Sequence, residues 1–143
     1  MRDTQKIRIL TEYRTVAIVG VSANPERPSN RVARYLNAHG FNIIPVNPTI
    51  DELLGKRGYP DLISIPEKVD IVDIFRKSED VEPVVDEAIK IGAKVVWMQE
   101  GVINKKAAEK AKKAGLFVVM DRCMRKEHIR LFHQEDKEEE KYD

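Results

Sequence analysis

The sequence predicts an α/β fold in which a doubly wound parallel sheet of about five strands lies between two layers of helices, a three-layer αβα arrangement. Five short apolar runs recur along the chain, and stretches with a helical spacing of apolar residues separate them. The runs are rich in β-branched residues and do not alternate with polar ones, which is typical of strands buried on both faces. The length of 143 residues suits one domain of this kind.

The first strand is expected over residues 15–20, and a loop rich in turn residues follows it. Ser29 can cap the next helix, which turns its apolar face to the sheet and stops at Gly40. Residues 41–46 form the second expected strand. Residues 47–67 are expected to form a loop with room for a short strand or a helical turn.

The second half of the chain repeats the alternation. Strands are expected over residues 70–75, 94–98 and 116–120, and helices over residues 81–89 and 105–114. Asn104 can cap the second of these helices, and the tryptophan of the fourth strand should belong to the core. Asp70 and Asp73 are expected to cap strand ends or to bond neighbouring backbone. Residues 1–13 and 124–133 also look helical and should pack outside the sheet. Right-handed crossovers then produce a Rossmann-like topology.

The composition excludes several classes of protein. The chain has 25 basic and 24 acidic residues, and a net charge of +1 makes no general case for nucleic-acid binding. No apolar run reaches the roughly 18 residues of a membrane span, and the polar N-terminus does not resemble a secretory signal. We therefore expect a cytoplasmic protein. The single cysteine, Cys123, permits no internal disulfide and no multi-cysteine zinc site. The high lysine and glutamate content is weakly typical of a heat-adapted source.

The charge is unevenly distributed along the chain. Residues 135–143 hold six acids and two bases, so this segment carries −4 and residues 1–134 carry +5. We expect residues 1–134 to form the single domain and residues 135–143 to form a disordered acidic tail. A mildly basic domain suits a ligand that contains phosphates.

Ligands of doubly wound sheets bind beyond the carboxyl ends of the strands. After the first expected strand, Gly20, Ser22, Arg27 and Ser29 lie on a loop that leads into the N-terminus of a helix. Backbone N–H groups, hydroxyls and a guanidinium at such a place favour an anion. The loop therefore predicts a phosphate or pyrophosphate site, with a purely structural turn as the alternative.

Three common nucleotide or phosphate sites are disfavoured. The loop reads G-V-S-A-N-P from Gly20, which leaves the G-x-G-x-x-G fingerprint incomplete. The second strand ends in Asn47 and Pro48 with Asp51 as the nearest acid, so nothing there suits the ribose of NAD. The chain also lacks the acidic pair of a phosphoaspartyl receiver after the first strand, and it lacks the P-loop motif.

Five motifs lie at the five expected strand ends: residues 20–29, 44–48, 70–76, 97–102 and 121–124. Together they resemble the small CoA-binding proteins, which are stand-alone domains similar to the CoA-binding domain of the succinyl-CoA ligase α subunit. The resemblance covers about residues 10 to 130. It implies a Rossmann-like, nucleotide-binding domain that binds coenzyme A, in a family without an established catalytic activity for its stand-alone members.

The resemblance also implies roles for single residues. The loop from Gly20 to Ala23 would cradle the pyrophosphate, with Arg27 beside it. Asn47 and Pro48 occupy the place where the ligase has a basic residue near the nucleotide phosphates, so recognition of the 3′-phosphate stays open. Phe75 and Arg76 would flank the adenine or the pantetheine arm, and the end of the fourth strand matches a ligase segment that touches CoA. The expected contacts are Gly20, Val21, Ser22, Ala23, Arg27, Ser29, Asn47, Pro48, Phe75, Arg76, Met98, Gln99 and Glu100.

Binding without catalysis is the preferred interpretation. The ligase needs a second domain with a phosphorylated histidine for its chemistry, and 143 residues are too few to hold that domain as well. Such a protein could serve as a regulator, a store or a partner subunit. The alternative is an enzyme, either a small NAD(P)-dependent reductase or a thiol-dependent acyl-CoA enzyme that uses Cys123. A third class is an interaction module without a ligand. A protein partner or a homo-oligomer stays open, whereas nucleic acid and membrane are not expected.

The histidines near Cys123 do not predict a metal site. His128 and His133 follow at spacings of five residues, which turn roughly 140° around a helix, so the three side chains share no face. A basic cluster in the same region is either a solvated helix face or a support for the phosphates of CoA. Its members are Arg122, Arg125, Lys126 and Arg130.

Overall fold

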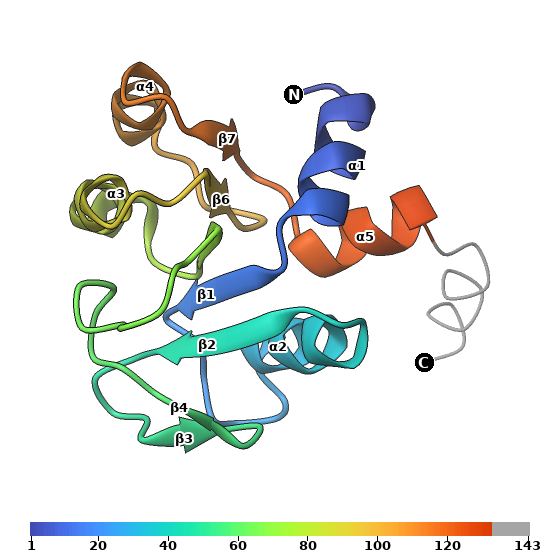
Figure 1. Ribbon diagram of the computed structural model, residues 1–143, viewed down its shortest axis with the longest axis vertical. Coiled ribbons are helices and arrows are strands. Elements are labelled where there is room, and N and C mark those ends of the chain that lie inside the picture. The colour runs from blue at the N-terminus through green and yellow to red at the C-terminus, as the bar shows by residue number, and fades with distance from the viewer. Residues whose placement is uncertain (133–143) are drawn as a thin grey trace.

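The computed structural model describes residues 1–132, and it confirms the predicted α/β class (Figure 1). The predicted acidic tail and His133 lie outside the described residues. The elements in chain order are α1 (Asp3–Glu12), β1 (Thr15–Val19), α2 (Pro28–Ala38), β2 (Asn42–Val46), β3 (Glu52–Leu53), β4 (Lys56–Arg57), β5 (Ile71–Ile74), a 3-10 turn (Ser78–Asp80), α3 (Val81–Lys90), β6 (Val95–Met98), α4 (Lys105–Lys113), β7 (Phe117–Val119) and α5 (Met124–Phe132).

The five long strands form one parallel sheet in the order β2-β1-β5-β6-β7. In chain order these are the second, first, third, fourth and fifth long strands, so the winding direction reverses between β1 and β5. Val19 at the end of β1 pairs with Val46 on one side and with Ile74 on the other. Strands β3 and β4 form a separate antiparallel hairpin within residues 47–67, where the sequence predicts a loop with room for a short strand or a helical turn.

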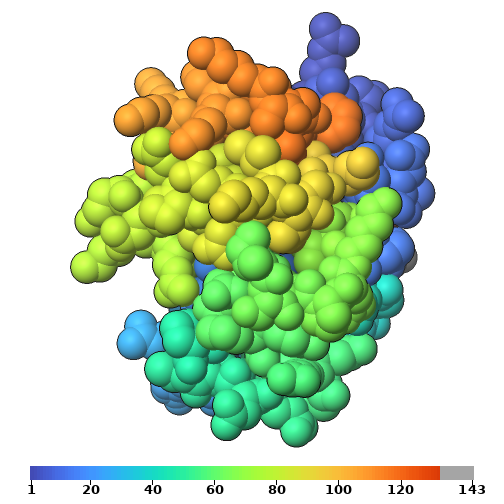
Figure 2. All heavy atoms as spheres, turned by 60° about the vertical axis from the view of Figure 1, so that its left-hand side comes forward, coloured from blue at the N-terminus to red at the C-terminus, as the bar shows by residue number. Residues whose placement is uncertain are grey.

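Helices cover both faces of the sheet (Figure 1). Helices α3 and α4 cover one face with stripes of valine and alanine, and residues 59–69 complete that core with Leu62 and Ile65. In Figure 2 the segment around residue 60 (green) lies against this layer (yellow-green to orange). Helices α1, α2 and α5 cover the other face, where Trp97 is fully buried as predicted. No helix within residues 1–132 has the length and apolar character to cross a membrane.

The local predictions for the helix ends are confirmed in one case and wrong in another. Asn104 caps α4 as predicted, because its Oδ1 accepts the N–H of Ala107 at 2.9 Å. Ser29 does not cap α2: the helix begins at Pro28, and no side chain caps it. Proline suits the first helical position because its φ is already helical and it has no N–H to satisfy. The hydroxyl of Ser29 accepts the N–H of Ser22 at 2.9 Å instead.

Asp70, directly before β5, and Asp73, within β5, differ. Asp70 behaves as predicted, because its Oδ2 accepts the N–H groups of Arg14 and Thr15 where β1 begins. The prediction for Asp73 is wrong: its side chain is fully buried in β5, and neither oxygen has a hydrogen-bond partner within residues 1–132. Burial raises the pKa of the Asp73 carboxyl well above its usual range.

Candidate functional site

Two adjoining hollows lie at the carboxyl end of the sheet, where the winding direction reverses. The smaller, here named the loop pocket, has a volume of about 300 Å³ and is lined by Gly20, Ser22, Arg27, Pro28, Ser29 and Phe75. The larger, here named the helix pocket, has a volume of about 480 Å³ and is lined by Glu26, Pro28, Arg31, Val32, Phe75, Gln99, Glu100, Cys123, Arg125 and Lys126. Pro28 and Phe75 line both pockets.

Gly20 lets the loop after β1 cross directly over the end of β5. Its φ is +85°, and a Cβ there would lie 2.1 Å from the carbonyl oxygen of Phe75. The Nη1 of Arg76 would lie 3.5 Å from the same Cβ position, so the Arg76 side chain is beside the crossing. The crossing is therefore open to glycine alone, and it ties the position of the loop to the position of β5.

Hydrogen bonds inside the loop fix its shape. The N–H of Ser22 donates to Ser29 Oγ, and the carbonyl of Ser22 accepts the Asn30 side chain at 2.9 Å. The N–H of Gly20 donates to the carbonyl of Val46 at 2.9 Å. The N–H groups of Ala23 and Ser29 donate to no acceptor within residues 1–132. The Ser29 group lies in the first turn of the eleven-residue α2 and is suited to an anion, whereas Ala23 lies on the loop before the helix.

Asn47 supports the loop from the end of β2. Its Nδ2 donates to the carbonyl of Val21 at 2.9 Å, and its Oδ1 accepts the N–H and the hydroxyl of Thr49. The amide of Asn47 is thus engaged on both sides with the protein itself. Pro48, next along the chain, is exposed and lines neither pocket.

Arginine side chains surround both pockets without being neutralised. Arg27 and Arg31 are exposed, and within residues 1–132 neither guanidinium has an ion pair or a hydrogen bond. Sequence reasoning missed Arg31, although it lies one helical turn after Arg27 and therefore on the same side of α2. That spacing could have identified it.

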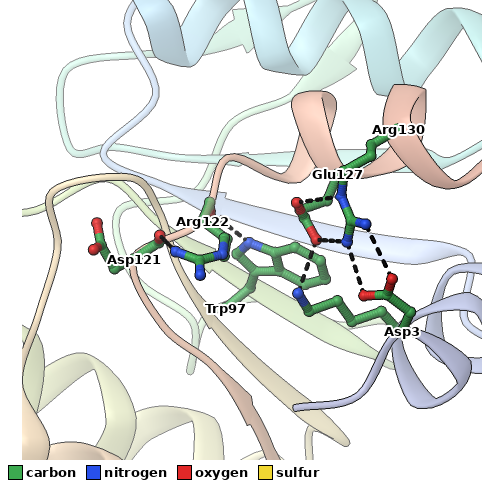
Figure 3. A network of polar contacts seen from close by, with 7 residues as sticks. Asp3, Trp97, Asp121, Arg122, Glu127 and Arg130 are labelled. Atoms are coloured by element: carbon green, nitrogen blue, oxygen red, sulfur yellow. Dashed lines mark hydrogen bonds and ion pairs between the residues drawn. The ribbon is translucent and has the colours of Figure 1, made fainter.

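The first turn of α5 forms the far wall of the helix pocket. Gln99 is buried, and its Oε1 accepts the N–H of Met124 at 2.9 Å, which caps α5 from the end of β6. Asp121 has a φ of +60°, and its Oδ1 accepts the N–H of Gly101 at 2.7 Å. Trp97 donates from Nε1 to the carbonyl of Arg122 at 2.8 Å (Figure 3). The ends of β6 and β7 are thus held together, and the half-buried Cys123 faces the pocket from this wall.

The structure divides the expected contacts of the fourth strand. The side chain of Met98 is fully buried in the core under α3 and α4 and lines neither pocket. Gln99 and Glu100 both line the helix pocket. Glu100 accepts the Lys126 ammonium with both oxygens at 3.0 Å, so this pair partly cancels its own charge.

The structure also divides the basic cluster of the last helix. Arg125 and Lys126 line the helix pocket, whereas Arg122 lies at a different hollow, between α4 and β7. Arg130 bonds to Asp3 and to Glu127 at 2.9 Å (Figure 3). It lines neither pocket.

A buried ion pair joins the two terminal helices beside this cluster. Lys6 Nζ lies 2.8 Å from Glu127 Oε2, and both side chains are less than one tenth exposed. Burial acts to raise the pKa of Glu127, but hydrogen bonds from Arg130 and Lys6 outweigh it and hold that pKa below its usual range. The network fastens α1 to α5 behind the pocket wall.

Comparisons with known proteins show which proteins this chain resembles. The model of the CoA binding domain family matches residues 14–129. The uncharacterized protein YneT of Bacillus subtilis is 40% identical over 120 residues, which are 84% of this chain and 89% of YneT. A solved structure of a hypothetical protein from Pyrococcus horikoshii OT3 superposes with a TM-score of 0.89 at 46% identity, covering 92% of each chain. Acetate–CoA ligase [ADP-forming] II of Archaeoglobus fulgidus is 32% identical over 90 residues, which are 62% of this chain and only 13% of the ligase.

Proposed function

Because the chain belongs to the CoA-binding domain family, we propose that it binds coenzyme A or an acyl-CoA at the carboxyl ends of its strands. The carrying observation is the loop pocket, where the N–H of Ser29, which has no acceptor within residues 1–132, lies in the lining together with Arg27 at the start of α2. An anion there can accept hydrogen bonds from both groups. The pyrophosphate of CoA is the ligand group that we assign to this pocket.

The pantetheine arm and the thiol end are assigned to the helix pocket. Val32 and Phe75 give this pocket an apolar wall, and Arg31 and Arg125 add positive charge to its lining. A ligand with a flexible, partly apolar arm and several phosphates fits this combination. The adenine then lies toward Asn47 and Pro48 at the end of β2.

Binding without catalysis is the preferred role. Within residues 1–132 no histidine lines either pocket, and of the two acids there, Glu100 is already paired with Lys126. The amide of Asn47 stands where an NAD-binding site has its ribose acid, so the end of β2 supports CoA over NAD.

Calorimetric titration tests the proposal. CoA, dephospho-CoA, ADP and NAD are compared on the wild-type protein, and CoA is repeated on Arg27→Ala. Losing a charge-assisted contact should weaken CoA binding by about 1.5–3 kcal/mol, roughly 10- to 150-fold. The matched control is Arg8→Ala, which removes the same charge on α1 away from both pockets. Absence of CoA binding at micromolar concentrations would overturn the proposal, and an equal effect of the two variants would remove Arg27 from the site.

One observation favours a second candidate function, a thiol-dependent acyl-CoA enzyme. The half-buried Cys123 lines the pocket assigned to the thiol end of CoA. Its thiolate would attack the acyl carbonyl, form a thioester on Cys123 and release CoA as the thiolate, which takes up a proton. Incubation with acetyl-CoA and longer acyl-CoAs, followed by mass spectrometry, tests this step. The acyl mass on the wild type and none on Cys123→Ser supports an enzyme, whereas an unlabelled wild type removes this candidate.

A further inference from the structure

Asp73 is a carboxyl group in the middle of the sheet. It is 0% exposed, and its register neighbours are Ile18 on β1 and Trp97 on β6. Neither oxygen has a hydrogen-bond partner within residues 1–132. An ionised carboxylate without a partner is far more costly to bury than a neutral one, so the conformation described here requires the neutral acid.

Among residues 1–132, no charged group bonds to Asp73 to compensate for this burial. The titratable or charged side chains in or against the core on the same side of the sheet are those of Lys6, Tyr13, Arg14, Tyr35, His39, Cys123, Arg125, Glu127 and His128. Lys6 and Glu127 pair with each other, and the ring of His128 bonds the Tyr35 hydroxyl at 2.7 Å. Burial is the sole cause of the raised pKa of Asp73. Ionisation of Asp73 can therefore be relieved only by a movement that brings water to it.

The strand that carries Asp73 also carries the floor of the site. Asp73 and Phe75 are two residues apart, so they point to the same side of the strand. Phe75 lines both pockets, and its carbonyl oxygen is the atom over which Gly20 crosses. The crossing has no spare room, so a displacement of the end of β5 displaces the loop with it.

We propose that Asp73 makes ligand binding depend on a proton: the loop pocket keeps its binding shape while Asp73 is neutral and loses it when Asp73 ionises. The inference rests on the proposed CoA binding and adds its regulation. In the conformation that binds CoA the Asp73 carboxyl keeps its proton, and in the relaxed conformation it releases that proton. Affinity for CoA therefore falls as the pH rises, by at most tenfold per pH unit for one linked proton.

The experiment compares the wild type with Asp73→Asn, which is similar in shape and cannot ionise. CoA affinity is measured by calorimetry from pH 5 to pH 9. The readout is the affinity of the wild type divided by the affinity of Asp73→Asn, because the titration of CoA itself affects both proteins equally. Trp97 is the single tryptophan of the chain and pairs with Asp73, so its fluorescence reports the ionisation without any ligand. We expect the ratio to fall with rising pH by tenfold or more, and a fluorescence step over the same range in the wild type alone.

Two controls keep the outcomes separate. Asp70→Asn removes a carboxylate from the other end of the same strand and should leave the pH profile of the wild type unchanged. Asp73→Ser replaces Asp73→Asn if the latter does not fold. A ratio that stays constant over the whole range overturns the proton dependence, even where the fluorescence changes. Failure of both proteins to bind CoA at every pH overturns the proposed function instead.

Discussion

Replacing Gly20 with alanine should damage stability and binding together. The backbone alone costs about 1–2 kcal/mol, because φ is +85°. The new Cβ would lie 2.1 Å from the carbonyl oxygen of Phe75, which is 1.3 Å closer than the 3.4 Å at which ordinary contact begins. The ends of β1 and β5 must separate to admit it, and forced overpacking of this kind costs about 1–3 kcal/mol more. The expected loss of unfolding free energy is therefore about 2–5 kcal/mol.

Gly115→Ala separates the two contributions. Gly115 has a φ of +91°, and a Cβ there meets nothing within 4 Å, so only the backbone cost of about 1–2 kcal/mol applies. Urea unfolding gives the stability of each variant, and calorimetry gives the CoA affinity of the folded protein. Gly20→Ala should lose the larger stability and most of its affinity, whereas Gly115→Ala should bind like the wild type. Equal losses of stability in the two variants, with wild-type affinity in both, would refute the tight crossing at Phe75.

Two further changes act on the supports of the site. Asn47→Ala removes the donor to the Val21 carbonyl, and we expect calorimetry to show CoA binding weaker by about 0.5–1.5 kcal/mol; unchanged affinity would mean that the loop keeps its shape without this bond. Glu127→Gln should flatten the acid side of the stability profile in urea unfolding from pH 2.5 to pH 7. Burial raises the pKa of Glu127, but hydrogen bonds from Arg130 and Lys6 lower it further, so the stabilisation is present above its ordinary pKa and is lost as the pH falls through the lowered one. A variant with the acid sensitivity of the wild type would contradict this.

The strands and helices could be predicted from the sequence because their patterns are local. The apolar run that ends at Gly20 predicts a strand, and the valine stripe of α3 predicts a helix. The structure confirms both. The hairpin of β3 and β4 was not predicted, because two-residue strands are too short for periodicity to identify. The cap of α2 was predicted wrongly, because a serine near a helix start has no unique partner until the loop before it is folded.

The contacts of Asp73 could not be predicted for a related reason. A polar residue in an apolar strand suggests a nearby partner, and Asp70 has one at the strand end. Asp73 has no partner within residues 1–132 because both flanking strands present apolar side chains, Ile18 and Trp97, at its register position. Register between strands that are distant in sequence is a property of the folded sheet.

The polar residues of the site are of two kinds: some bond to the protein backbone and support its shape, and others have no partner in the part of the chain that the structure describes. The two kinds should respond differently to salt. Asn47 and Gln99 use their amides on the protein backbone, whereas the guanidiniums of Arg27 and Arg31 have no partner within residues 1–132. A free cation that meets a phosphate contributes a charge interaction that salt screens, whereas a support acts through the shape of the loop. The salt dependence of CoA affinity should therefore become shallower in Arg27→Ala and stay the same in Asn47→Ala, although both variants bind more weakly. Equal salt slopes in the wild type and both variants would mean that Arg27 also acts through shape.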